Sequence, residues 1–151
     1  MDFFIKFFCA CTLFLQSCNM ASGSYPYAEK YVINYPEDSV ISAIKIFKKE
    51  NPKFSVPLVT IDGTNFWSLE DGKTKDSLWY SFYFYYEEDN QIILTLVRQS
   101  EKNKTVISLV SINKGLKIGQ WQRINKDLTS KENRKQKEKF EKEILNTIKV
   151  I

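Results

Sequence analysis

Apolar residues recur at three-to-four spacing in the segment that follows Pro36. They are Val40, Ala43, Ile44 and Phe47, and this spacing is typical of one face of an α-helix. Pro36 suits an early helical position, and the acids at 37 and 38 suit the positive end of the helix dipole. Asn51-Pro52 would end the helix. The pattern predicts a helix whose apolar face packs on another element.

Strand patterns follow this helix. The segments Ser55–Ile61 and Thr64–Leu69 flank Asp62-Gly63, a dipeptide that suits the positive φ angles of a tight hairpin. Aromatic and β-branched residues predict three longer strands, roughly Leu78–Tyr86, Gln91–Gln99 and Thr105–Ile112. Short polar loops separate these strands, which implies antiparallel neighbours.

Side-chain alternation assigns the residues of the three longer strands to two faces, provided that each loop holds an even number of residues. One face would carry Tyr80, Phe82, Phe84, Tyr86, Ile93, Thr95, Val97, Val106, Ser108, Val110 and Ile112. The other would carry Trp79, Ser81, Tyr83, Tyr85, Ile92, Leu94, Leu96, Arg98, Ile107, Leu109 and Ser111. Because both sets are largely apolar, we expect both faces to be covered, the second by a helix, by the first hairpin or by a partner.

A closing helix is predicted from Thr129-Ser130-Lys131-Glu132, which fits the capping-box pattern. Its first two turns are polar, and an apolar stripe forms only at Phe140, Ile144, Leu145 and Ile148. We therefore expect its C-terminal half to dock on the domain. The complete pattern predicts one α+β domain with a leading helix, an antiparallel meander of about five strands and a closing helix.

Composition narrows the possible chemistry. The 151 residues include no histidine, and all three cysteines lie within the first 18 positions. This distribution excludes Ser-His-Asp and Cys-His catalysis, a zinc site built on Cys or His and an internal disulfide framework in the chain beyond Cys18. We expect no cofactor and no metal.

The N-terminal segment has the pattern of a targeting signal. An apolar run from Phe3 to Leu15, interrupted only by Lys6, has the length of a signal-peptide h-region and is too short to span a bilayer. Leu15-Gln16-Ser17-Cys18 then resembles the lipobox of bacterial lipoproteins. The other interpretations are an ordinary cleaved signal peptide or a buried N-terminal strand.

The resemblance to small bacterial lipoproteins is specific over residues 1–18 and implies lipidation of Cys18. Residues 1–17 would be the signal peptide, residues 18–30 the lipidated cysteine and a flexible tether, and residues 31–151 the domain. The resemblance also implies a membrane anchor in the bacterial cell envelope, and Asn19 after the cysteine points to the periplasmic side of the outer membrane. Because the protein would be exported from the cytoplasm, we expect no nucleic-acid partner.

Two surfaces are candidates for binding. The predicted register gathers Trp79, Tyr83, Tyr85 and Arg98, with a cation–π contact between Trp79 and Arg98. This group would take up a sugar, a peptide or a protein surface, or it would form a second core layer. The second surface is a basic helix face that includes Lys131, Arg134, Lys135 and Lys139. It would attract acidic lipids or an acidic partner, or it would be a solvated face balanced by glutamates.

The remaining acidic residues cluster at 70–76 and 87–89. Paired carboxylates can perform glycosidase chemistry, but the first cluster contains two lysines and both clusters look like turns. We therefore expect a non-catalytic envelope lipoprotein that binds a protein or peptide, for example an immunity protein or an inhibitor. The alternatives are a carboxylate-type hydrolase of envelope glycans and a structural subunit of an envelope complex.

Overall fold

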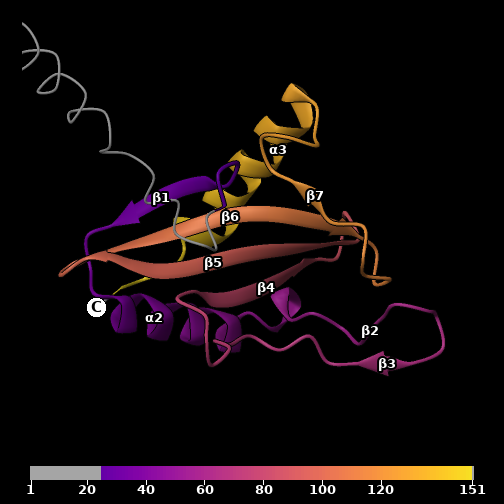
Figure 1. The fold of residues 1–151 in the computed structure, drawn as a ribbon, viewed down its shortest axis with the longest axis horizontal. Coiled ribbons are helices and arrows are strands. Elements are labelled where there is room, and N and C mark those ends of the chain that lie inside the picture. Colours follow the sequence, from indigo (N-terminus) through magenta and orange to yellow (C-terminus); the bar gives the residue numbers. More distant parts are fainter. Residues whose placement is uncertain (1–24, 151) are drawn as a thin grey trace, which may run out of the picture.

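The computed structural model describes residues 25–150, and these form the predicted α+β fold. A five-stranded antiparallel sheet has the strand order β1-β6-β5-β4, with β7 beside β6 (Figure 1). Its strands are β1 (Glu29–Ile33), β4 (Tyr80–Tyr86), β5 (Gln91–Glu101), β6 (Lys104–Lys114) and β7 (Gln122–Arg123). The expected lipidation site Cys18, the signal peptide and residues 19–24 of the tether lie outside the described residues.

The leading helix α2 (Glu37–Glu50) confirms the first prediction. Its stripe of Val40, Ala43, Ile44 and Phe47 is buried, and acids and lysines lie at the ends that the helix dipole favours. The chain then turns through a short 3-10 helix (Pro52–Phe54) that buries Phe54. The ring centroids of Phe47 and Phe54 are 5.3 Å apart, so this turn extends the apolar face of the helix.

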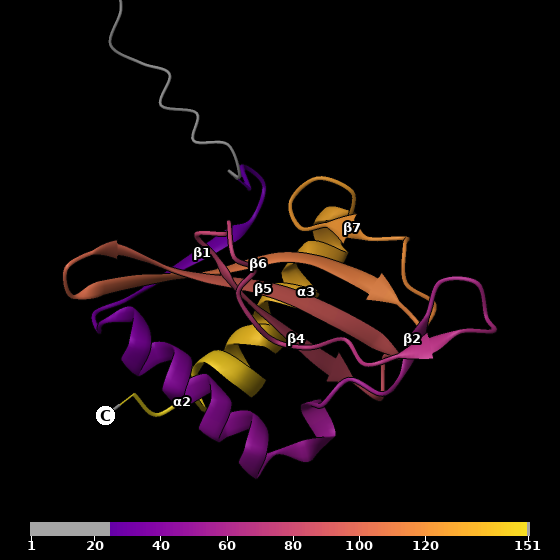
Figure 2. The ribbon, with the colours of Figure 1, turned by 60° about the horizontal axis from the view of Figure 1, so that its bottom comes forward.

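The closing helix α3 (Ser130–Phe140) begins with the predicted capping box, in which Thr129 and Glu132 exchange hydrogen bonds. A π-helical turn (Glu141–Leu145) continues it. Phe140 and Ile144 are buried, which confirms that the C-terminal half docks. Figure 2 shows α2 and α3 on the same side of the sheet, and their apolar residues share one core with Phe82 and Phe84.

The pairing of β4 with β5 follows the predicted register. Tyr86 lies opposite Gln91 across a four-residue turn, and Phe82, Phe84 and Tyr86 point into the helix-covered core as expected. An even loop keeps the alternation of both strands in phase, which is why the sequence alone was sufficient here.

The predicted faces of β6 are wrong for most of the strand. Leu94 pairs with Ser111 and Thr95 pairs with Leu109, so Val110 is an extra residue that forms a β-bulge. A second register shift, between Gln99 and Glu101 beside the β5–β6 turn, pairs Val97 with Ile107 and places Ile107 and Leu109, rather than Val106 and Ser108, in the helix-covered core. The bulge puts Val110 in the second apolar layer and returns Ile112 to its predicted face. Alternation cannot anticipate such a bulge, because one inserted residue moves the following side chains to the opposite face.

Strand β1 was not predicted and begins inside the segment assigned to the tether. It pairs with β6 from Glu29 opposite Leu109 to Ile33 opposite Thr105. Contacts with α3 and the π-helical turn hold it in place, since Lys137 forms an ion pair with Glu29 at 3.1 Å and Tyr31 donates a hydrogen bond to Glu141. These partners are about a hundred positions away in the chain, so no local pattern reveals the strand.

The predicted first hairpin exists, but it is short and separate from the main sheet. Its strands are β2 (Val59–Thr60) and β3 (Phe66–Trp67), and Asp62 accepts hydrogen bonds from the backbone N–H groups of Thr64 and Asn65. The hairpin projects from one end of the domain (Figure 1). Backbone hydrogen bonds between Thr60 and the chain at residues 116–118 attach its base.

Irregular segments, and not a helix or the first hairpin, cover much of the second sheet face. Tyr25 and Ala28 pack against the apolar cluster of Trp79, Leu96 and Val110. Gly72 pairs with Ser81 beside the edge strand, and Trp121 lies beside Tyr83 with ring centroids 6.3 Å apart. The second face is therefore a second apolar layer built from loops.

Candidate binding site

Trp79 and Arg98 meet as the register predicts. The guanidinium carbon of Arg98 lies 4.4 Å from the centroid of the Trp79 ring, and Tyr25 packs edge-on against the same ring. Trp79 is only 8% exposed. This burial favours the interpretation of the pair as part of the second core layer.

Tyr83 is held at the edge of the sheet. Its backbone N–H donates to Asp71 Oδ1 at 2.8 Å, and its carbonyl accepts from Lys48 Nζ at 2.7 Å. Asp71 and Lys48 also form an ion pair with each other. Together with the Gly72–Ser81 bridge, this clasp occupies polar groups that an edge strand would otherwise offer to another chain. Burial raises the pKa of the Tyr83 hydroxyl.

The four basic residues predicted on the face of α3 differ in their surroundings. Lys131 and Arg134 are exposed, whereas Lys135 and Lys139 form ion pairs with Asp89 of the β4–β5 turn at 3.1 and 2.7 Å. The hydrogen bond from Lys139 is the main reason why the pKa of Asp89 lies below its usual range. Half of the predicted cationic surface therefore joins the helix to the sheet.

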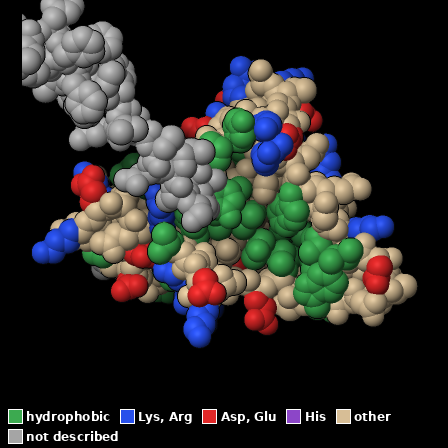
Figure 3. Space-filling view, in the orientation of Figure 1, with side chains coloured by type: hydrophobic (Ala, Val, Ile, Leu, Met, Phe, Trp, Pro, Cys, Tyr) green, Lys and Arg blue, Asp and Glu red, His purple; other side chains and the backbone are tan. Residues whose placement is uncertain are grey.

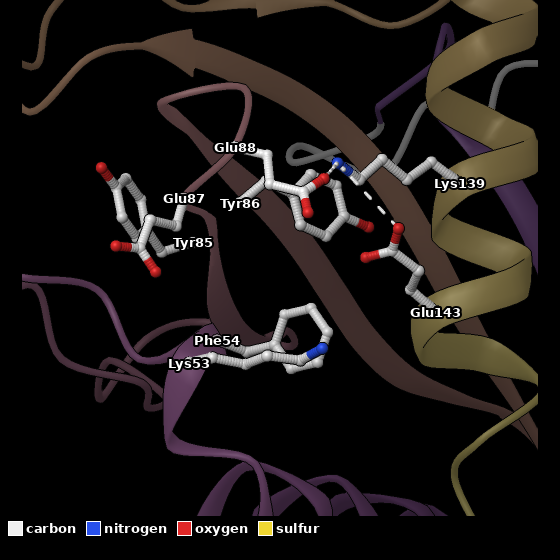
Figure 4. A pocket seen from close by; sticks show the side chains of 8 residues that line it. All are labelled: Lys53, Phe54, Tyr85, Tyr86, Glu87, Glu88, Lys139 and Glu143. Atoms are coloured by element: carbon white, nitrogen blue, oxygen red, sulfur yellow. Dashed lines mark ion pairs between the residues drawn. The ribbon is translucent and has the colours of Figure 1, made fainter.

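Tyr85 and Lys139, which the sequence assigned to different surfaces, line one pocket of about 170 Å³ (Figure 4). The pocket lies beside the turn that follows β4, between the 3-10 helix and the end of α3. Its other lining residues are Lys53, Phe54, Tyr86, Glu87, Glu88 and Glu143. Tyr85 and Tyr86 are the last two residues of β4, and both line this cavity.

Lys139 organises the polar side of this pocket. Its Nζ lies 2.7 Å from Asp89, 3.9 Å from Glu88, 4.0 Å from Glu143 and 4.5 Å from the centroid of the Tyr86 ring. Figure 4 shows Glu88 and Glu143 approaching Lys139 from the turn and from the helix. The π-helical turn supplies Glu143 to the pocket and Glu141 to Tyr31.

Tyr86 forms a buried wall of the pocket. The residue is 3% exposed, and its hydroxyl has no hydrogen-bond partner among residues 25–150. Burial is the main reason why the pKa of this hydroxyl lies well above its usual range. A buried hydroxyl without a partner is unfavourable for stability.

Sequence reasoning missed Lys53, Phe54, Tyr86 and Glu143 as neighbours of Tyr85. The only available signal was the aromatic run in β4, because the other residues come from segments far apart in the chain. Their meeting depends on how the two helices pack on the sheet.

The pocket has only part of the geometry of a carboxylate hydrolase. Glu88 and Glu143 both approach Lys139, so their oxygens lie within about 8 Å of each other, a separation that glycosidases use. Such enzymes also keep one carboxyl protonated, usually by enclosing it. The Glu88 side chain is 92% exposed, so the arrangement favours binding over acid catalysis.

The projecting hairpin is the second candidate surface. Leu58, Ile61 and Phe66 lie on or beside it and are 59%, 60% and 59% exposed. Figure 3 shows hydrophobic side chains gathered on the visible face of the molecule, between the grey atoms and the hairpin end. A large exposed apolar area is typical of a protein-binding surface.

Within the described part of the chain, no cluster of acidic or thiol side chains is suited to hold a metal ion. None of the helices between residues 25 and 150 has the length and apolar character needed to cross a membrane. Comparison of the chain with protein-family models, curated proteins and solved structures finds no match.

Proposed function

We propose that this protein is a lipid-anchored protein of the bacterial cell envelope that binds another protein without catalysing a reaction. The exposed apolar side chains of the projecting hairpin carry the proposal. Leu58, Ile61 and Phe66 are each more than half exposed, and burying the exposed part of such side chains in a partner would contribute about 1–2 kcal/mol each. An immunity protein or an inhibitor is one concrete form of this function.

The covered edge of the sheet supports recognition through side chains. Asp71, Lys48 and Gly72 engage the backbone of β4, so addition of a partner strand at residues 81–83 would require the clasp to open. The hairpin needs no such rearrangement, because its apolar side chains already face solvent.

Site-specific photo-crosslinking in cells tests the binding surface. A photoreactive phenylalanine analogue at position 66 or 61 of the full chain should give the same crosslinked protein, whereas position 103 in the β5–β6 turn should give none. Phe66→Asp should abolish the adduct formed from position 61. Equal adducts from all three positions, or no adduct from 61 and 66, would contradict the proposal.

Metabolic labelling with a palmitate analogue tests the anchor separately. The wild-type protein should carry the label and sediment with membranes, and Cys18→Ala should lose both properties. If the Cys18→Ala protein were still labelled, lipidation at Cys18 would be wrong, while the crosslinking result would stand on its own.

A further inference from the structure

We propose that the pocket beside the β4–β5 turn binds one pyranose ring of a carbohydrate. The first argument is size. The cavity measures about 170 Å³, and a cavity of about 150 Å³ holds a six-membered ring the size of benzene. A single sugar ring fits this space, whereas a folded peptide segment does not.

The second argument is the chemical difference between the two sides of the pocket. Tyr85, which is partly exposed, presents aromatic surface on one side, and Lys139 with Glu143 forms the other (Figure 4). The ring of Phe54, 4% exposed beneath Lys53, closes the base. A pyranose has the same asymmetry, with C–H bonds on its faces and hydroxyls around its edge. Aromatic walls with a few convergent polar groups are typical of small-molecule sites.

The third argument is the mixture of donors and acceptors. Lys53 and Lys139 can only donate hydrogen bonds, and the carboxylates of Glu87, Glu88 and Glu143 can only accept them. A sugar hydroxyl does both, so adjacent hydroxyls can satisfy a mixed set. An anion or a cation would meet like charge on part of the wall.

The pocket is also organised in advance. Asp89 fixes Lys139 through a 2.7 Å ion pair, and the π-helical turn brings Glu143 to within 4.0 Å of the same ammonium. The hydroxyl of Tyr86, buried and without a protein partner in the described chain, points toward the side that Glu143 forms (Figure 4). Because this hydroxyl is closed to solvent, Tyr86 serves as a packed wall behind the polar side of the pocket.

Amide NMR titration of the full-length protein tests this proposal. The micelles should be of a polyoxyethylene detergent, because detergents with sugar headgroups would compete. Methyl glucoside, methyl galactoside and N-acetylglucosamine serve as probes. At least one should shift amides at residues 85–89 and 139–143 with a dissociation constant in the millimolar range. Sorbitol, a polyol without a ring face, should produce no such shifts.

Matched variants separate binding at this pocket from general effects. Tyr85→Ala should weaken binding about tenfold, and Tyr85→Phe should retain it because the ring remains. Glu143→Gln should also weaken binding, since an acceptor becomes partly a donor. Tyr35→Ala removes an exposed tyrosine outside the pocket and should have no effect. Unchanged dispersion of the amide spectrum would show that each variant is folded.

Three results would overturn the proposal. The first is the absence of shifts at the pocket at about 50 mM of every pyranoside, a concentration well above a millimolar dissociation constant. The second is tighter binding of lysine amide than of any pyranoside, which would identify a cation site. The third is equal affinity of the wild type and Tyr85→Ala for the sugar that shifts the pocket amides.

Discussion

Replacement of Asp71 by alanine is expected to destabilise the fold by opening the clasp on β4. The Asp71 carboxylate accepts the backbone N–H of Tyr83 and forms an ion pair with Lys48. These two side chains are 22% and 14% exposed. Removing the carboxylate leaves a largely buried ammonium, for which the Tyr83 carbonyl remains as a hydrogen-bond acceptor on β4. It also leaves the Tyr83 N–H without its acceptor.

The magnitude follows from these two losses. A hydrogen bond to a charged group contributes about 1.5–3 kcal/mol, and breaking a fully buried ion pair costs about 3–5 kcal/mol. Because both side chains keep some contact with water, we expect about 2–3 kcal/mol for Asp71→Ala. Asp71→Asn keeps an acceptor for the Tyr83 N–H but turns its amide donor toward the Lys48 ammonium, so it should cost nearly as much, about 2 kcal/mol.

Urea denaturation of the full-length protein in polyoxyethylene detergent measures these effects. The melting temperature should also fall, by about 6–12 °C for Asp71→Ala. Asp76→Asn, an exposed acid in the same loop, is the control and should change stability by less than about 0.5 kcal/mol. A double-mutant cycle with Lys48→Ala should give a coupling of about 1–2 kcal/mol.

A loss for Asp71→Ala no larger than that of Asp76→Asn would refute this reasoning. So would a coupling energy of zero, because the two side chains would then act independently. Loss of the clasp also exposes the edge of β4, so sedimentation should show more self-association of Asp71→Ala than of the wild type.

Three further predictions concern the helices and the turn. Thr129→Ala removes the capping box and should lower the free energy of unfolding by about 1 kcal/mol in urea, with Ser130→Ala as a control that should have a smaller effect. Phe140→Ala empties a core site that is 1% exposed and should cost about 3–5 kcal/mol, measured by the same titration; a loss below 1 kcal/mol would contradict its core position. Because Lys139 lowers the folded-state pKa of Asp89, the pair stabilises the fold above the carboxyl's unfolded value and loses this contribution as pH falls through the lowered pKa. The stability difference between wild type and Asp89→Asn should therefore shrink as the pH falls below the ordinary aspartate pKa of about 3.9, and a constant difference would show that the ion pair does not contribute.

The two helices could be predicted from residues that are near neighbours in the sequence. The apolar spacing after Pro36 and the capping box at Thr129 concern residues within one or two turns of each other, so the sequence was sufficient to place both. The turn at residues 87–90 is also local, and its even length set the register of β4 against β5. The cation–π contact between Arg98 and Trp79 followed from that register.

The binding site shows the limit of such reasoning. Tyr85 and Lys139 were identified as candidates on separate surfaces, and the structure places them in one pocket. Phe54 and Glu143 had no signal that could connect them with Tyr85, because each belongs to a different element. The hairpin was predicted, but the exposure of Phe66 depends on its separation from the main sheet.

The sequence by itself determined helices α2 and α3, the three long strands β4 to β6, the first hairpin, the α+β class and the absence of histidine and cysteine beyond residue 18. These properties depend on composition and on interactions between near neighbours in the chain. Only the tertiary structure decided that β1 joins the sheet, that register shifts beside the β5–β6 turn and at Val110 set the faces of β6, and that the pocket forms beside the β4–β5 turn. Each of these depends on packing between distant segments, where the free energy of burial outweighs local preference.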